Sequence, residues 1–154
     1  MTKEMIRIAN CSGFYGDKLS VAKDMVEGGP IDVLTGDYLA ELTMTILYNQ
    51  KIKRGEDHGY VGTFLKQFKD VAKSTQEKNI KIVSNAGGLN PKAMALEVEK
   101  IIDELNLKLK VAYIEGDDLI PEFQKLSEAG EKFKNLDNQI NLSDYPKKPI
   151  TANA

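Results

Sequence analysis

Residues 80–105 read IKIVSNAGGLNPKAMALEVEKIIDEL, and this stretch decides the fold class. The run at 80–83 is short, apolar and rich in β-branched residues, which is typical of a buried strand. Asn90 and Pro91 then have the character of a helix N-cap and first helical residue. Apolar residues follow at helical spacing, namely Met94, Val98, Ile101, Ile102 and Leu105. The stretch therefore predicts a strand, a glycine-containing turn and a helix.

The same alternation extends along the chain. Three further apolar runs have strand character, at 5–9, 31–34 and 109–114. Three further amphipathic stripes predict helices, at about 17–27, 38–51 and 59–78. We therefore predict an α/β fold with an open, mostly parallel, doubly wound (Rossmann-like) sheet and helices on both faces. The sheet is expected to contain at least the four strands named here.

The periodic signal fades after Pro121. We assign residues 1–126 to the α/β domain and residues 127–154 to a polar linker with Pro146 and Pro149 near its end. We expect this linker to lead into a continuation beyond the chain. The chain is thus predicted to be an incomplete unit.

Composition limits the function classes. Lys and Arg total 21 against 23 Asp and Glu, a net charge of −2, so there is no basic excess to bind nucleic acid. No apolar run is long enough to span a membrane, and the N-terminus lacks a secretory signal. The single cysteine, Cys11, favours a reducing compartment, so we expect a cytoplasmic protein. With one histidine, His58, a zinc site is disfavoured.

Ligands of parallel sheets bind beyond the carboxyl ends of the strands. All four predicted strands lead into polar or glycine-rich loops, which we call the rim. The ligand-binding candidates on the first and third loops are Asn10, Ser12, Gly13, Gly16, Asn85, Gly87, Gly88 and Asn90. The Gly13-x-x-Gly16 turn suits a phosphate at a helix N-terminus, and the Gly87-Gly88 turn suits an anion nest. The alternative for both is a tight turn that needs glycine at positive φ.

Acidic residues follow the second and fourth strands. Asp37 and Asp117 are the candidate catalytic acid and base, and Glu115 and Asp118 add negative charge to the same edge. Such a cluster suits Mg²⁺ held by oxygen ligands, although we assign no metal ligands. Helix capping is the alternative for Asp37 and Asp118. Cys11 is expected to be a buried, inert thiol rather than a nucleophile.

Four segments of the rim and its strands resemble the acyclic terpene utilisation (AtuA-like) family. They are residues 8–17, 28–41, 83–91 and 111–118. The resemblance covers roughly residues 5–120, is faint over 123–148 and resumes at 150–154. It implies a catabolic protein of acyclic isoprenoids such as citronellol and geraniol, whose intermediates are acyl-CoA thioesters. It implies no set of catalytic residues.

Two functions of different classes remain open. The first is an enzyme that acts on a branched acyl-CoA or hydroxy-acid intermediate by hydratase or lyase chemistry, with the rim carboxylates as acid and base. The second is a binding or scaffold module that assists a partner enzyme, such as an acyl-CoA carboxylase, or that assembles as a homo-oligomer. A nucleotide-binding domain is a third reading. It is weakened because neither a dinucleotide fingerprint nor a P-loop is present.

Overall fold

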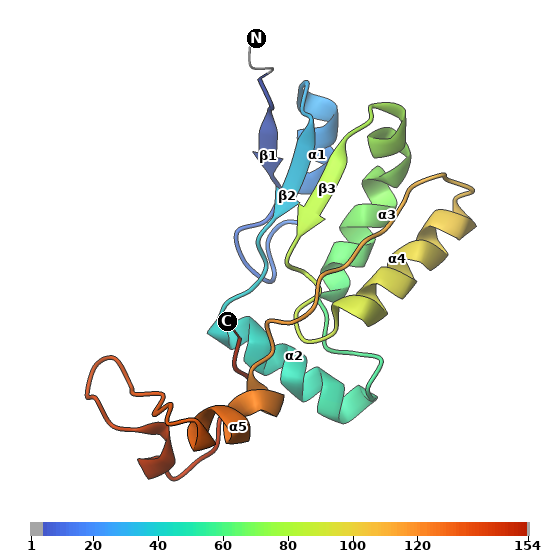
Figure 1. Cartoon of the computed structure of the whole chain (residues 1–154). Coiled ribbons are helices and arrows are strands. Elements are labelled where there is room, and N and C mark those ends of the chain that lie inside the picture. Colours follow the sequence, from blue (N-terminus) through green and yellow to red (C-terminus); the bar gives the residue numbers. More distant parts are fainter. Residues whose placement is uncertain (1–4, 154) are drawn as a thin grey trace. The chain divides into compact units, whose positions relative to one another are not determined.

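Three short strands form a parallel sheet in the N-terminal part of the chain (Figure 1). They are β1 (Ile8–Asn10), β2 (Val33–Gly36) and β3 (Lys81–Ser84), paired in the order β1-β2-β3. The computed structural model describes residues 5–153. In its sheet register, Ile8 lies opposite Val33, which lies opposite Lys81. The three strands predicted near residues 5, 31 and 80 are therefore confirmed.

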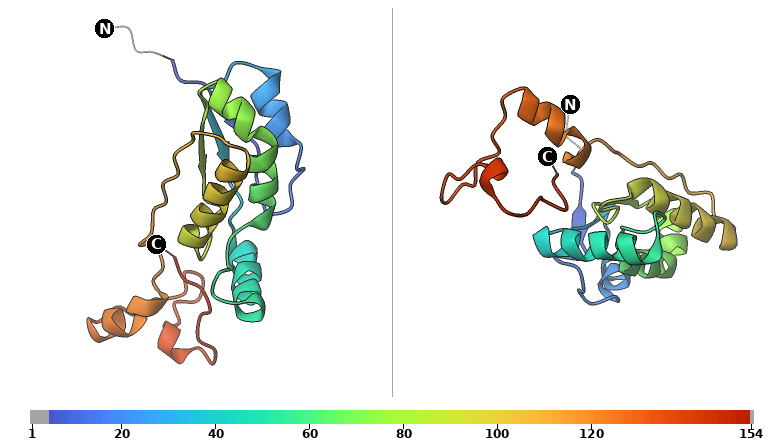
Figure 2. Two further views of the ribbon diagram at one scale, coloured as in Figure 1. Left: turned by 90° about the vertical axis from the view of Figure 1, so that its right-hand side faces the viewer. Right: turned by 90° about the horizontal axis from the view of Figure 1, so that it is seen from below.

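Four helices accompany the sheet, and all four were predicted. They are α1 (Val21–Gly28), α2 (Glu41–Arg54), α3 (Gly62–Glu77) and α4 (Pro91–Glu104). α1 and α3 cover one face of the sheet, and α4 packs against α3 (Figure 2). The core joins the helices to the inward side chains of the strands; examples are Val26, Leu34 and Val71 in one cluster. α4 begins as expected, with Pro91 in its first turn and Asn90 Oδ1 accepting the Ala93 N–H at 3.1 Å.

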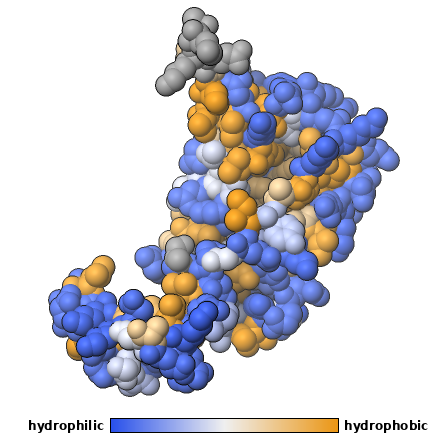
Figure 3. Space-filling view, in the orientation of Figure 1, coloured by the Kyte–Doolittle hydropathy of each residue, from blue (hydrophilic) through white to orange (hydrophobic). Residues whose placement is uncertain are grey.

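The doubly wound arrangement with helices on both faces is not confirmed. Strand order follows chain order, so the crossovers through α1 and α3 move in the same direction and deliver both helices to the same face. A doubly wound sheet needs the strand order to reverse. The other face carries Ile8 and Val83, which are 65% and 60% exposed, and apolar surface is visible there (Figure 3). The structure is an α/β fold with an open parallel sheet.

The predicted fourth strand at residues 109–114 is wrong. Within residues 5–153, no backbone hydrogen bond joins this segment to β3, and the sheet has three strands. The segment is instead held by side chains: alternate residues Leu107, Leu109 and Val111 pack against the cluster that α3 and α4 build. The alternation that resembled a strand therefore reflects packing onto helices.

The chain divides into two compact units, Met1–Ile114 (unit 1) and Glu115–Ala154 (unit 2). Unit 2 contains α5 (Phe123–Glu128) between the short 3-10 helices η1 (Ile120–Glu122) and η2 (Leu142–Asp144). The segment that was expected to be a linker belongs to unit 2. No residue that the structure describes in unit 2 is buried, whereas unit 1 contains two buried clusters. Among the described helices of the whole chain, none is long and apolar enough to cross a membrane.

Candidate functional site

The rim was defined by the loops after four predicted strands. In the three-stranded sheet of the structure it consists of the loops that follow β1, β2 and β3, and Asn85 connects two of these loops. Asn85 Nδ2 donates to Asp37 Oδ1 at 2.6 Å, and Asn85 Oδ1 accepts the backbone N–H of Tyr38 at 2.8 Å. One side chain after β3 thus orients both the backbone and the carboxylate of the loop after β2. Asp37 and Asn85 are both exposed. The structure therefore brings these two predicted site residues into contact at the carboxyl end of the sheet.

Asn10 extends the same polar edge to β1. Its Oδ1 accepts from Thr35 Oγ1 at 3.1 Å, and its Nδ2 donates to the Ser12 carbonyl at 2.9 Å. The same carbonyl accepts the Asp37 N–H at 3.0 Å, which ties the first two loops together. Ser12 is itself buried, and its hydroxyl donates to the Phe14 carbonyl. Asn10 is thus part of the exposed edge, whereas the buried Ser12 holds this edge through its carbonyl oxygen, which accepts from Asn10 and Asp37.

Two hydroxyl residues of the rim were not selected from the sequence. Thr35 Oγ1 also donates to the Ala9 carbonyl at 3.2 Å, and Ser84 Oγ donates to the Gly36 carbonyl at 3.0 Å. Both bonds link neighbouring strands at their carboxyl ends. The signal that was available is position: each is a short polar residue at the end of an apolar strand, one or two residues before a selected residue.

Asp37 is the rim residue with spare hydrogen-bonding capacity. Among the hydrogen bonds of residues 5–153, the Asp37 carboxylate accepts one, at Oδ1. Its Oδ2 is therefore a free acceptor on an exposed side chain. The capping alternative is wrong for Asp37, because α2 has Ala40 at its N-cap position and no side-chain cap. Asp118 is not the N-cap residue of η1 either, because Leu119 holds that position without a side-chain cap; Asp118 Oδ1 instead accepts the Ile120 N–H at 2.9 Å in a local turn.

The loop after β1 already contains its own anion. The Asp17 carboxylate accepts the Gly13 N–H at 3.0 Å and the Lys18 N–H at 2.9 Å. These two backbone hydrogen bonds hold the pKa of Asp17 below its ordinary value. Gly16 adopts a φ of 109°, which the turn requires and which favours glycine. A phosphate that used the Gly13 amide would have to displace Asp17.

The Gly87-Gly88 turn is packed against the protein. Gly88 has a φ of 53°, and a Cβ built on it would clash with a Leu47 methyl carbon and lie 2.9 Å from the Gly59 carbonyl oxygen. Three successive amides also have internal acceptors: Gly88 N–H donates to Asn85, Leu89 N–H to Gly59, and Asn90 N–H to Gly87. The tight-turn role therefore has direct support here. Ligand binding by Gly87, Gly88 and Asn90 stays a prediction.

Cys11 lies below the rim in a buried polar contact. Its sulfur is 3.9 Å from the Tyr38 hydroxyl, which donates to Gln67 Oε1 at 2.6 Å. Burial raises the pKa of the Cys11 thiol and also that of the Tyr38 hydroxyl. The expected burial of Cys11 is confirmed. A buried thiol with a raised pKa is a poor nucleophile, and its inertness stays a prediction.

Asp117, the second predicted catalytic residue, belongs to unit 2, as do Glu115 and Asp118. Its Oδ2 accepts from Asn153 Nδ2 at 2.9 Å. Among the described residues, no group of three or more His, Cys, Asp or Glu side chains could hold a metal ion. The expectation that these carboxylates follow a fourth strand of the sheet falls with that strand. The three rim loops contain the carboxylates of Asp17 and Asp37, and that of Asp17 is engaged by two backbone N–H groups.

Comparison with known proteins gives one result. The chain matches the family described as acyclic terpene utilisation family protein AtuA over residues 6–154. The match runs through residues 123–148, where the resemblance was expected to be faint, and so includes unit 2. No match was found to a curated protein or to a solved structure. Since the family match extends over nearly the whole length, the chain belongs to the acyclic terpene utilisation family AtuA.

Proposed function

We propose that the rim binds the polar end of a branched, hydroxylated intermediate of acyclic terpene utilisation, either a hydroxy acid or its acyl-CoA thioester. Family membership implies the pathway class. The observation that supports the site is the exposed Asp37 carboxylate, held by Asn85 through a bond of 2.6 Å with Oδ2 uncommitted. A carboxylate oxygen is an acceptor only, so the ligand group opposite it must be a donor. An alcohol hydroxyl satisfies this requirement.

The same contact has a chemical consequence. A carboxylate within hydrogen-bond distance of a hydroxyl or a water molecule can act as a general base toward it. Asn85 keeps one carboxylate oxygen fixed, so the other is directed at the ligand. Hydratase or lyase chemistry at Asp37 is the finer part of the proposal, and Asn10 and Asn85 act in it as positioning residues.

The proposal is tested with Asp37→Asn in the full chain. The variant keeps an oxygen that can accept from Asn85, but it loses the negative charge that strengthens a bond to a ligand hydroxyl. We expect affinity for a branched β-hydroxyacyl-CoA to fall about tenfold or more, with little change for its deoxy counterpart. Asp70→Asn, at an exposed position on α3, is the matched control. Equal affinities of Asp37→Asn and the unaltered protein, measured by titration calorimetry, would remove Asp37 from the site.

A second candidate function is a non-catalytic module that assists a partner enzyme. The observation that favours it is the uncovered face of the sheet, where Ile8 and Val83 are exposed in unit 1. Large exposed apolar side chains on one face favour association. If this is the function, Ile8→Lys should abolish co-purification with the partner and leave β-hydroxyacyl-CoA binding unchanged. A shift to a monomer in Ile8→Lys, seen by light scattering, would identify a second copy of the chain as the partner.

A further inference from the structure

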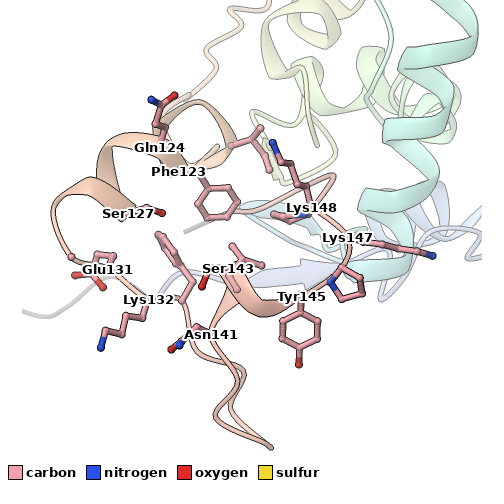
Figure 4. A pocket seen from close by; sticks show the side chains of 16 residues that line it. Phe123, Gln124, Ser127, Glu131, Lys132, Asn141, Ser143, Tyr145, Lys147 and Lys148 are labelled. Carbon is pink, nitrogen blue, oxygen red and sulfur yellow. The ribbon is translucent and has the colours of Figure 1, made fainter.

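One cavity is lined only by residues of unit 2, and none of its lining residues belongs to the rim. Its volume is ≈ 930 Å³, within the range of small-molecule sites. Its walls come from η1, α5, η2 and the segments that join them, and the Phe123 side chain of α5 points into it (Figure 4). A cavity of this size in a small unit is a candidate site for a small molecule.

Two aromatic side chains, Phe123 and Phe133, line the cavity, and both are half-buried. Phe123 and Phe133 meet edge to face, with ring centroids 4.8 Å apart and planes at 73°. Ile120 and Leu142 add aliphatic surface. These four side chains are half-buried, and no residue that the structure describes in unit 2 is fully buried. A small unit without a buried core is marginal by itself, so an apolar body in this cavity would supply the missing burial.

Phe133 is held in an unusual backbone conformation. Its φ of 46° lies in the left-handed region, which glycine and asparagine tolerate and which a bulky aromatic residue rarely adopts. Such a conformation costs free energy and persists only where the surroundings enforce it, often at ligand sites. Here it places the Phe133 ring against Phe123 on the cavity wall.

The margin of the cavity is positively charged. Its lining contains three lysines, Lys132, Lys147 and Lys148, against a single acidic residue, Glu131. Unit 2 as a whole has more acidic than basic residues, so the excess of lysine is confined to the lining of the cavity. Lysine binds carboxylates and phosphates as a mobile point charge on a long stem. A ligand that matches both the aromatic side chains and the lysines of the lining has an apolar part and an anionic group.

We propose that the unit 2 cavity binds an amphipathic organic anion, with its apolar chain on Phe123 and Phe133 and its anionic group near Lys147 and Lys148. In a protein of acyclic terpene utilisation, that chemistry has two sources: the free carboxylate of a branched acyclic acid, or the phosphates of its CoA thioester. The inference does not depend on the proposed function of the rim, because no rim residue lines the cavity.

The experiment is titration calorimetry on the full chain with three probes: geranate, geranyl-CoA and neutral geraniol. Geranate, geranyl-CoA or both should bind saturably and more tightly than geraniol, and the tighter of the two identifies the source of the anion. Phe133→Asn removes the ring at a position where asparagine tolerates the backbone. It should therefore weaken anion binding about tenfold without lowering the melting temperature.

The lysines are tested by the double variant Lys147→Gln with Lys148→Gln. Anion binding should fall about threefold for each charge removed at low salt, and the difference should shrink at high salt. Lys134→Gln is the matched control, since Lys134 is exposed in the same unit but does not line the cavity. The proposal is overturned if neither anion binds saturably, if geraniol binds as tightly as geranate, or if the Phe133 and lysine variants bind like the unaltered protein.

Discussion

Substituting Gly88 by alanine tests whether the turn after β3 serves packing or ligand binding. Gly88 has a φ of 53°, and an added Cβ would clash with the Leu47 side chain and lie 2.9 Å from the Gly59 carbonyl oxygen. Leu47 is fully buried in the core, and the Gly59 carbonyl already accepts the Leu89 N–H at 2.8 Å. Neither neighbour can move without disturbing the core or the connection between α2 and α3.

Two costs therefore add in Gly88→Ala. The left-handed conformation costs a residue with a Cβ about 1–2 kcal/mol, and the overpacking against Leu47 and Gly59 costs about 1–3 kcal/mol. We expect the free energy of unfolding to fall by roughly 2–5 kcal/mol, and Tm to fall by roughly 10 °C.

Gly62→Ala provides the control for this substitution. Gly62 lies in α3 with no atom within 4 Å of the added Cβ. Because Gly62 is the first residue of α3 and not a mid-helix position, the substitution should change the free energy of unfolding by less than about 0.5 kcal/mol. Urea unfolding followed by circular dichroism measures both variants. A Gly88→Ala protein within about 0.5 kcal/mol of the unaltered one would refute the packing argument and return Gly88 to a ligand role.

Three further predictions follow from particular contacts. The hydrogen bonds from Arg7 lower the pKa of Asp32 from 3.8 to about 2. The resulting stability is present above pH 4 or so and is lost as pH falls toward about 2, so Asp32→Asn should flatten this part of the urea-unfolding pH profile; an unchanged profile contradicts the pairing. Asn90→Ala should lower the free energy of unfolding by about 1–2 kcal/mol, and Asn90→Ser should recover the cap but not the bonds from Nδ2 to Glu56 and His58. Backbone amides of residues 109–114 should exchange with solvent faster than those of β3 in hydrogen-exchange mass spectrometry, and equal protection would restore a fourth strand.

The existence and parallel direction of the three strands in the sheet could be predicted from the sequence, but their first residues could not. The apolar run at 5–9 predicted a strand that starts three residues earlier than β1. The reason is a non-local pair: Arg7 N–H donates to the Asp32 side chain at 2.8 Å instead of to a ladder carbonyl. A pattern of apolar residues contains no information about a carboxylate 25 positions away.

The site shows the same limit. The parallel-sheet rule correctly put Asn10, Asp37 and Asn85 on one edge, because all three follow the carboxyl ends of neighbouring strands. It could not show that Asn85 bonds Asp37 across 48 positions of sequence. Nor could it show that Asp17 occupies the Gly13 amide. Those contacts depend on side-chain geometry. Because of them, the rim is interpreted as a site with one oriented carboxylate, that of Asp37, and no longer as a general phosphate-binding site.

The segment at 109–114 explains why an alternating pattern is not sufficient evidence for a strand. Alternation means only that every second side chain is buried on one side, which is true of a paired strand and equally of an extended chain lying on helices. Leu109 and Val111 are half-buried against the core cluster to which α3 and α4 contribute, so the pattern is satisfied without any ladder. Once that strand is removed, the sheet has three strands, and Asp117 no longer follows the end of a strand. The misread pairing thus accounts for two corrections, the number of strands in the sheet and the place of Asp117 on its edge, whereas the lack of a reversal follows from the order of β1, β2 and β3.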